Sequence, residues 1–295
     1  METHVIKILS VVAPVFFIIG LGYFFARFKK LSLEPIIDIM LYLTIPALVL
    51  SSLSRKSFMP SELGLIALAT LVVVLGTGAL SRAYLTITKQ RDMRGFYLPA
   101  MFMNTGNMSF PLALLAFGAD GLAVSVLYYV SISVLVYTLG IYIAKGKGGF
   151  KEVFKLPLIY AAAVGIFLNF LEIKLPAPVI STVDMLGAAT IPIMQISLGY
   201  RLHSTHILSP AISFAGSLIR ILGGLLVAYV FVSVFGIEGL NRKIILLSST
   251  MPSAVINFVI TQKYDVNSDI VASIVITSTL LSIISTPILL LWIMD

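Results

Sequence analysis

The sequence predicts an all-α polytopic membrane protein. Hydrophobic residues make up 59% of the 295 residues and charged residues only 11%, whereas soluble domains carry about 25% charged residues. The mean hydropathy is +1.05. Apolar segments of about 20 residues, the length that crosses the hydrocarbon core of a bilayer, recur along the whole chain and are separated by short loops. These features predict a single membrane domain that covers residues 1–295.

The composition also argues against other classes of protein. The net charge of +7 comes largely from Lys and Arg in loops between apolar segments, where basic residues set membrane topology. We therefore expect no nucleic-acid partner. The chain has no Cys, which excludes disulfides and thiolate metal sites, and we expect neither a metal nor a cofactor. The first apolar segment is long enough to span and lacks a small-residue cleavage site, so we interpret it as a transmembrane helix rather than a signal peptide.

Ten spans are predicted, with both termini on the extracellular or periplasmic side of the cell membrane. Of the 20 Lys and Arg residues, 13 fall in loops that this orientation places inside and 6 in loops that it places outside. An excess of Lys and Arg marks cytoplasmic loops, so this bias sets the orientation. The ten spans are residues 5–26, 34–54, 61–83, 95–118, 121–144, 156–172, 178–201, 209–235, 241–263 and 269–293.

The chain contains an internal repeat with an offset of 146 residues between the second and seventh spans. A repeat of five spans is odd in number, so the second copy must be inverted in the bilayer, as in many secondary transporters. The two repeats are predicted to cover residues 1–146 and 152–295. The matching residues are Asp38 and Asp184, Thr44 and Thr190, Ile45 and Ile191, Pro46 and Pro192, and Ser51 and Ser197.

The fourth span is interrupted by polar residues at its middle, from Asn104 to Pro111. Pro111 cannot donate a helical hydrogen bond and its ring crowds the preceding turn, so we predict that the helix breaks or kinks there. Freed backbone groups at membrane depth are tolerated only inside protein or beside a wet cavity. The interruption therefore predicts a binding site.

The ninth span has a corresponding interruption, a polar run from Ser248 to Asn257 that contains Pro252. The fourth and ninth spans are therefore both predicted to be broken helices. Inverted-repeat transporters bind their substrates at such discontinuous helices.

The ends of broken helices suit a carboxylate ligand. A half-helix N-terminus presents unpaired N–H groups and a partial positive charge, which together bind anions. Amide and hydroxyl side chains nearby add further donors. A structural kink capped by Asn104 and a helix–helix hydrogen bond from Asn257 are the alternatives. The candidate substrate-binding residues are Asn104, Thr105, Gly106, Pro111, Pro252, Ser253, Asn257, Tyr128 and Gln195.

Three charged residues in the spans are candidates for charge pairing or coupling. Asp38 and Asp184 are possible proton carriers, but each lies near the start of a span, where a carboxylate simply favours the helix N-terminus. Arg220 lies about eleven residues into the eighth span, where an unpaired guanidinium is costly. It is expected to pair with a substrate carboxylate, with an acidic residue or with protein carbonyls. Pro46 and Pro192 are expected to kink their helices around the cavity.

Several motifs match those of a known family. They are Asn104-Thr105-Gly106, Phe110-Pro111-Leu112-Ala113-Leu114, Phe117-Gly118, Gly121-Leu122-Ala123, Val126-Leu127-Tyr128, Ile191-Pro192, Met251-Pro252-Ser253-Ala254 and Thr279-Leu280-Leu281-Ser282. By these motifs the chain resembles the auxin efflux carrier (PIN-like) family of organic anion transporters, within the bile acid/arsenite/riboflavin transporter superfamily. The resemblance extends over essentially the whole chain.

The resemblance implies a scaffold of spans 1, 2, 6 and 7, often dimerising, and a transport domain of spans 3–5 and 8–10 that moves like an elevator. It also implies that the broken fourth and ninth helices cross at the membrane midplane within the transport domain. It implies that Asn104 contacts a substrate carboxylate, in an anion such as malate, malonate or an auxin-like acid. Many relatives carry an acidic or Asn residue just after the Leu-Tyr pair, whereas this chain has Tyr129, Ser131 and Ser133. We therefore do not extend the coupling mechanism of these relatives to this chain.

Three other functions fit the sequence less well. A sodium-coupled bile-acid-like symporter requires clustered Glu, Gln and Asn oxygens around the crossing, and the acidic ones are missing. A receptor or sensor requires an appended signalling domain, and the loops are too short to hold one. An intramembrane enzyme is disfavoured because the chain has no His-Glu-x-x-His motif and no Cys.

Overall fold

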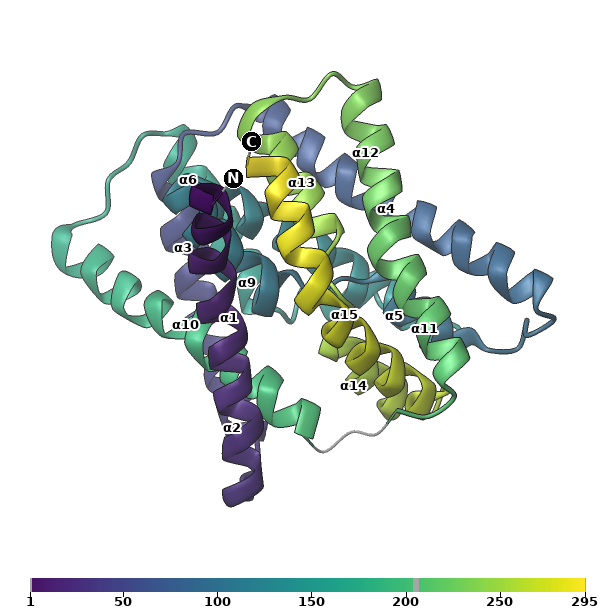
Figure 1. The fold of residues 1–295 in the computed structure, drawn as a ribbon. Coiled ribbons are helices and arrows are strands. Elements are labelled where there is room, and N and C mark those ends of the chain that lie inside the picture. The colour runs from purple at the N-terminus through teal and green to yellow at the C-terminus, as the bar shows by residue number, and fades with distance from the viewer. Residues whose placement is uncertain (1, 204–206, 295) are drawn as a thin grey trace.

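The computed structural model describes residues 2–203 and 207–294, and these residues form helices without any strand (Figure 1). Apolar segments become helices because a helix satisfies its own backbone groups where water is absent. The α-helices are α1 (Glu2–Phe28), α2 (Glu34–Ile39), α3 (Ile45–Arg55), α4 (Pro60–Ile87), α5 (Tyr97–Met101), α6 (Phe110–Leu135), α7 (Ile141–Lys145), α8 (Phe150–Val153), α9 (Pro157–Phe170), α10 (Ala177–His203), α11 (Pro210–Leu218), α12 (Gly224–Val234), α13 (Gly239–Ser249), α14 (Val255–Lys263) and α15 (Ser268–Met294).

Short helical turns of other types join some of these helices. Four are π-helical and one is a 3₁₀-helix. A π-turn inserts an extra residue into a helix and often lies at a functional site. The π-turns are η1 (Met40–Thr44), η3 (Thr105–Ser109), η4 (Val136–Gly140) and η5 (Ile219–Gly223), and the 3₁₀-turn is η2 (Arg94–Phe96).

Seven helical stretches within the described residues are long and apolar enough to cross a bilayer, fewer than the ten predicted. Non-helical residues divide the predicted spans 95–118 and 241–263, and α9 has only 14 residues. The fifth predicted span is continuous with the end of the fourth in one stretch of 41 residues, Thr105–Lys145. Gly118, at φ 71° and ψ −162°, turns the chain inside this stretch. The count of ten spans stays a prediction.

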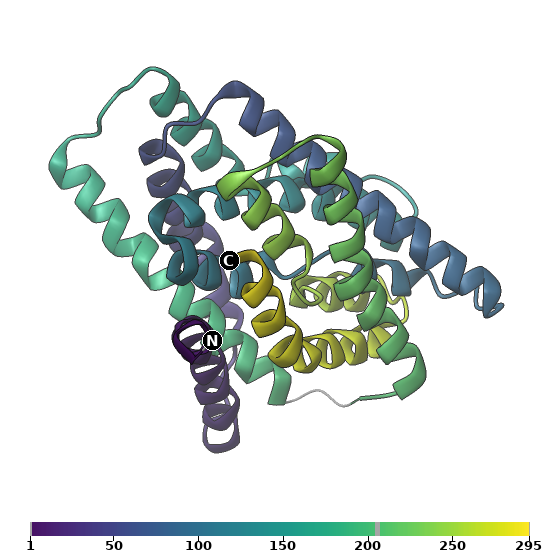
Figure 2. The ribbon, with the colours of Figure 1, turned by 45° about the horizontal axis from the view of Figure 1, so that its top comes forward.

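The helices gather on two sides of the molecule. α1, α3, α9 and α10 lie on the left in Figure 1, whereas α4, α11 and α12 lie on the right, and Figure 2 shows the same separation. The start of α1 and the end of α15 lie at one end, which we call the terminal face, and the loop between α1 and α2 lies at the opposite end, the distal face. α10 runs from the terminal towards the distal face.

On the left side, α1 packs along α10 and α3 packs along α9. Small residues allow membrane helices to approach closely. A Cβ atom built on Gly199 of α10 would collide with the carbonyl oxygen of Ile19 in α1. Across the other pair, a Cβ atom on Gly165 of α9 would lie 3.2 Å from the Cβ atom of Leu53 in α3. Glycines therefore allow the close approach in each pair, and Gly22 of α1 meets Ile196 of α10 in the same way as Gly199 meets Ile19.

Candidate functional site

Two extended stretches meet at the centre of the molecule. One follows α5 at residues 102–104, and the other follows α13 at residues 251–254. The Asn104 N–H donates to the Pro252 carbonyl at 2.7 Å, and the Ala254 N–H donates to the Phe102 carbonyl at 3.1 Å. These bonds make an antiparallel bridge between Met103 and Ser253. Segments about 150 residues apart in the sequence are thereby fixed side by side.

Arg220, in η5, binds the helix ends that enter this bridge. Its Nη1 donates to the carbonyls of Ala100 at 2.9 Å and Met101 at 2.7 Å, at the end of α5. Its Nη2 donates to the carbonyl of Ser249 at 2.8 Å, at the end of α13. The side chain is fully buried. Of the alternatives open from the sequence, the structure therefore has Arg220 bound to protein carbonyls.

Other candidate residues from the sequence belong to the same buried core. Asn257 Nδ2 donates to the Phe102 carbonyl at 2.8 Å and to Ser253 Oγ at 3.0 Å. The hydroxyl of Tyr128 lies 2.9 Å from Ser249 Oγ. Asn257, Ser253 and Tyr128 have no exposed surface. Their hydrogen bonds stabilise the bridge and the helix ends around it.

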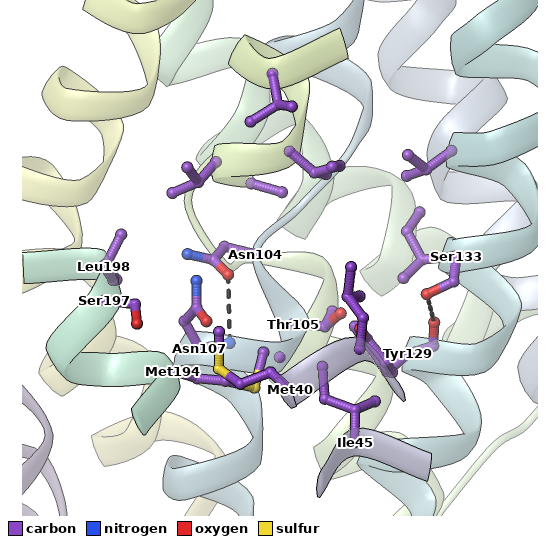
Figure 3. A pocket seen from close by; sticks show the side chains of 18 of the residues that line it. Met40, Ile45, Asn104, Thr105, Asn107, Tyr129, Ser133, Met194, Ser197 and Leu198 are labelled. Atoms are coloured by element: carbon purple, nitrogen blue, oxygen red, sulfur yellow. Dashed lines mark hydrogen bonds between the residues drawn. The ribbon is translucent and has the colours of Figure 1, made fainter. Parts of the chain in front are cut away.

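A cavity of about 360 Å³ lies beside the bridge, and we call it the central cavity (Figure 3). η1, η3, α6, η4, α10 and α14 supply its walls, and most of its lining side chains are apolar. In Figure 3, Asn104 lies between Ser197 of α10 on the left and Tyr129 of α6 on the right. The polar side chains that line it are Asn104, Thr105, Asn107, Ser133, Ser197 and Arg201, with the phenols of Tyr129 and Tyr137.

Two helix N-termini border the central cavity. η3 begins at Thr105 and continues into α6, and α14 begins at Val255; the first residues of both line the cavity. The first N–H groups of a helix lack partners within it and carry partial positive charge. Gly106 contributes backbone here without a side chain that would cover it. The cavity is therefore electropositive on the side of the bridge.

Asn104, which also lines the cavity, carries a side-chain donor without a partner. Its Oδ1 accepts from the Asn107 N–H at 3.3 Å, capping η3, whereas its Nδ2 has no hydrogen-bond partner although the residue is only 3% exposed. The Thr105 hydroxyl likewise lacks a partner. A buried donor left without a partner costs about 1–3 kcal/mol, so these two groups mark a position where a ligand would stabilise the protein.

Arg201, near the distal end of α10, is the only charged side chain among the described residues that line the central cavity. From the sequence we counted Arg201 as a loop charge that sets topology, and its place in the cavity was missed. The helical spacing of Ser197 and Arg201, four residues apart, is a signal that would have placed both on one face.

The tyrosines that line the cavity are Tyr129 and Tyr137, whereas the candidate substrate-binding residue Tyr128 does not line it. We predicted Tyr128, but the lining residues are those that share a helix face with Tyr129. A rotation of about 100° per residue separates the two tyrosines. The pattern of polar and aromatic residues at i, i+3, i+4, i+7 and i+8 is the signal for this face: Tyr129, Ile132, Ser133, Val136 and Tyr137.

A second cavity, of about 520 Å³, lies on the terminal side and is called the terminal cavity. It is lined by the first half of α10, by α3 and by the part of α6 around Gly118. Its charged lining residues are Arg55, Lys56, Asp120 and Asp184. Asp184 accepts a hydrogen bond from Ser51 Oγ at 2.6 Å and forms an ion pair with Arg55. The candidate Asp184 therefore lies apart from Asn104, at the other cavity.

Pro111, Pro46 and Pro192 do not break their helices, whereas Pro252 lies where the helix is interrupted between α13 and α14. Pro111 is the second residue of α6, directly after the π-turn η3, and the non-helical residues lie upstream, at residues 102–104. A proline in the first turn is tolerated because the N–H that it lacks would have no helical partner. Pro46 likewise follows the π-turn η1, and α10 continues through Pro192. Pro252 lies inside the second extended stretch.

The remaining candidates lie outside the central cavity. Asp38 is an exposed residue of α2. Gln195 is 1% exposed on α10, and neither of its amide atoms has a partner. Asn104, Thr105 and Gly106 are the predicted substrate-binding residues that line the cavity.

Comparisons with known proteins agree with the sequence resemblance. Residues 7–155 and 147–290 match a family described as "Membrane transport protein". An uncharacterised transporter from Methanocaldococcus jannaschii is 28% identical over 302 residues, which cover 94% of this chain and 96% of the relative. Another, from Methanothermobacter thermautotrophicus, is 27% identical over 263 residues, which cover 84% of this chain and 85% of the relative.

The matches extend over most of the chain and, with seven apolar helices among the described residues, indicate an integral membrane transporter rather than an enzyme. The resemblance to the auxin efflux carriers is confirmed. The chain belongs to this family of membrane transport proteins.

Proposed function

We propose that this protein is a secondary transporter of organic anions and that the substrate carboxylate binds in the central cavity. One observation carries the proposal: two helix N-termini, the unpartnered Nδ2 of Asn104 and the guanidinium-bearing Arg201 border the same cavity. All of them favour negative charge. A site made mainly of partial charges binds an anion and still releases it, as a transporter must.

The binding of Arg220 to the helix ends supports this assignment. A helix C-terminus carries partial negative charge, which would repel an anion nearby. The guanidinium donates hydrogen bonds to carbonyls at the C-terminal ends of α5 and α13. The negative ends are therefore neutralised, while the positive ends of η3 and α14 face the cavity.

We further propose that the chain consists of ten spans in two inverted repeats, with broken fourth and ninth helices that cross at the midplane. The packing of α1 on α10 and of α9 on α3 supports this arrangement. Ile19 meets Gly199 in the first pair, and Gly165 meets Leu53 in the second. Residues 19 and 165, and residues 53 and 199, are each 146 apart. The two contacts are thus the same pair of positions, with the glycine moved from one partner to the other.

The proposed mechanism is an elevator. α1, α2, α3, α9 and α10 form the scaffold, which also provides a homodimer interface, and α4–α7 and α11–α15 form the transport domain. The central and terminal cavities adjoin successive halves of α10, as expected if the transport domain slides along the scaffold. From the distribution of basic residues, the terminal face is proposed to lie outside the cell.

The substrate is proposed to be malate, malonate or a related small carboxylate, or an auxin-like acid. Arg201 is the one cationic side chain among the described lining residues, which favours an anion with a single carboxylate on an apolar body. A sodium-coupled symporter is the alternative, and the described lining contains no Asp or Glu that would supply acidic oxygens to a sodium ion.

The test is uptake by purified protein in liposomes. Labelled malate, malonate and indole-3-acetate would be supplied under imposed pH, voltage and sodium gradients, with empty liposomes as the control. We expect uptake of at least one anion. Uptake of none under any gradient, together with no thermal stabilisation by these carboxylates, would overturn the proposal. Binding that stabilises the protein without transport would favour a receptor or sensor instead.

A further inference from the structure

The scaffold lines the central and terminal cavities with equivalent residues of the internal repeat. Most of the described scaffold residues at the central cavity, including those of η1, have a counterpart 146 positions away that lines the terminal cavity. In an inverted repeat, equivalent positions lie towards opposite faces of the membrane. The clearest pairs, with the central residue first, are Ile45 and Ile191, Met194 and Leu48, and Ser197 and Ser51.

The bridge between the two extended stretches is symmetric in the same sense. Its two hydrogen bonds run from Asn104 to Pro252 and from Ala254 to Phe102. Asn104 and Ala254 are 150 positions apart, and so are Phe102 and Pro252. The two helices that follow the bridge, η3 and α14, also begin 150 residues apart. An exchange of the two halves of the chain therefore leaves the bridge and its two helix N-termini in the same arrangement.

The contacts of the bridge with the scaffold are not symmetric. Gly106 of η3 lies against Met194 of α10, since a Cβ atom built on Gly106 would be 2.5 Å from Met194 Cε. The equivalents of these two residues are Ile256 of α14 and Leu48 of α3. Ile256 lines the central cavity, whereas Leu48 lines the terminal cavity. The bridge is therefore seated at one of two equivalent surfaces of the scaffold.

We propose that the terminal cavity is the second position of the substrate site, and that Ile256 packs against Leu48 when the site opens to the terminal face. The transport domain then carries Asn104 and the two helix N-termini from the scaffold surface around Ser197 to the surface around Ser51. This inference rests on the proposed elevator and adds to it the residues that form the second position.

The two scaffold surfaces are chemically alike. Met194 and Leu48 are apolar side chains that can replace one another in a packed interface at little cost, and Ser197 and Ser51 are identical. Movement of the site from one surface to the other therefore exchanges similar contacts. The two states then stay within a few kcal/mol of each other, which allows a carrier to populate both.

The experiment cross-links pairs of introduced cysteines with Hg²⁺, because the chain has no Cys of its own. The test pair is Leu48→Cys with Ile256→Cys. Gly106→Cys with Met194→Cys reports the state seen in this structure. The matched control, Gly165→Cys with Leu53→Cys, joins α9 to α3 within the scaffold, so its spacing does not depend on the transport domain. Each variant would be treated in liposomes, and the linked protein would be examined by electron cryomicroscopy.

We expect all three pairs to link. The test link holds the site at the terminal cavity, with Asn104 beside Ser51, and the Gly106–Met194 link holds it at the central cavity, with Asn104 beside Ser197. Either link stops uptake of whichever of malate, malonate or indole-3-acetate the unlinked protein transports, and excess dithiothreitol restores it. The control link leaves uptake unchanged, because it joins two parts of the scaffold that do not move relative to each other.

The outcomes separate this inference from the proposed function. A test pair that does not link while the other two pairs do, or a linked protein in which Asn104 remains beside Ser197, overturns the second position and leaves anion transport standing. A test link that places Asn104 beside Ser51 in a protein that transports none of the three anions supports the second position and overturns the anion assignment. If Leu48→Cys does not insert, Ser52→Cys, which also lines the terminal cavity, takes its place and the same results are required.

Discussion

The Nη1 atom of Arg220 lies 2.7 Å from the carbonyl oxygen of Met101, where α5 ends. The same guanidinium reaches Ser249 at the end of α13, so one buried side chain joins two helices from different halves of the chain. Its position in the middle of an apolar segment is therefore explained by protein carbonyls.

We predict that Arg220→Gln destabilises the protein. A glutamine leaves buried carbonyl oxygens without donors, at roughly 1–3 kcal/mol for each, and the melting temperature in detergent should fall by several degrees. Arg242→Gln serves as the control and should melt like the wild type. An unchanged melting temperature combined with lost transport would instead make Arg220 a substrate ligand.

The variant Asn104→Asp separates the capping of η3 from the proposed binding of substrate, the two roles assigned to this side chain. The aspartate keeps the oxygen that caps η3 at the Asn107 N–H, and a negative charge at a helix N-terminus is favourable, so the melting temperature should not fall. It replaces the free Nδ2 donor with an anion, so the KM should rise by more than about tenfold. Transport kinetics and melting curves would be compared with those of Asn267→Asp, outside the cavity, where Oδ1 likewise accepts a hydrogen bond from a backbone N–H. Wild-type kinetics for Asn104→Asp would remove Asn104 from the site.

Two glycine substitutions test the helix spacing in the scaffold. Gly199→Ala forces α10 away from Ile19 of α1 and should destabilise the protein by about 1–3 kcal/mol, as overpacking does. Gly165→Ala meets Leu53 at 3.2 Å, so a smaller loss is expected. Thermal melts of both variants under identical conditions provide the measurement. Equal losses would contradict the difference in clearance.

Orientation can be tested with single cysteines, since the chain has none. α4 lies between two loops, which contain Ser57 and Lys89, and both residues are exposed. We predict that Ser57→Cys reacts with a membrane-impermeant maleimide in intact cells. Lys89→Cys should react only after permeabilisation. The reverse pattern would place the terminal face inside the cell.

The sequence located the polar residues at the centre of the molecule but did not reveal the backbone geometry around them. Polar residues and a proline in two apolar segments drew attention to residues 104–111 and 248–257, and the extended stretches lie at residues 102–104 and 251–254. The prediction of a helix break at Pro111 was wrong because a proline costs little in the first turn of a helix. The end of α5 is instead set by pairing with Pro252 and Ala254, a contact between distant segments that no local pattern encodes.

Side-chain partners were the hardest part to predict. The sequence shows that burying Arg220 is costly. Its partners are backbone carbonyls, however, and because every residue has one, the sequence does not indicate which carbonyls it binds. Arg201 was counted with the loops because it lies near a helix end, and only the packing of α10 against η1 and η3 brings it to the cavity. Asn104 was identified because it begins a polar interruption in an apolar segment and belongs to a motif of the family.

The bridge between Met103 and Ser253 has a consequence for selectivity. Because main-chain hydrogen bonds tie the two extended stretches together, the donors around Asn104 would keep one spacing throughout the proposed elevator movement. Such a carrier presents the same arrangement of hydrogen-bond donors to substrates from either side of the membrane. Competing anions should therefore be preferred in the same order during import and export, even where the two directions differ in speed.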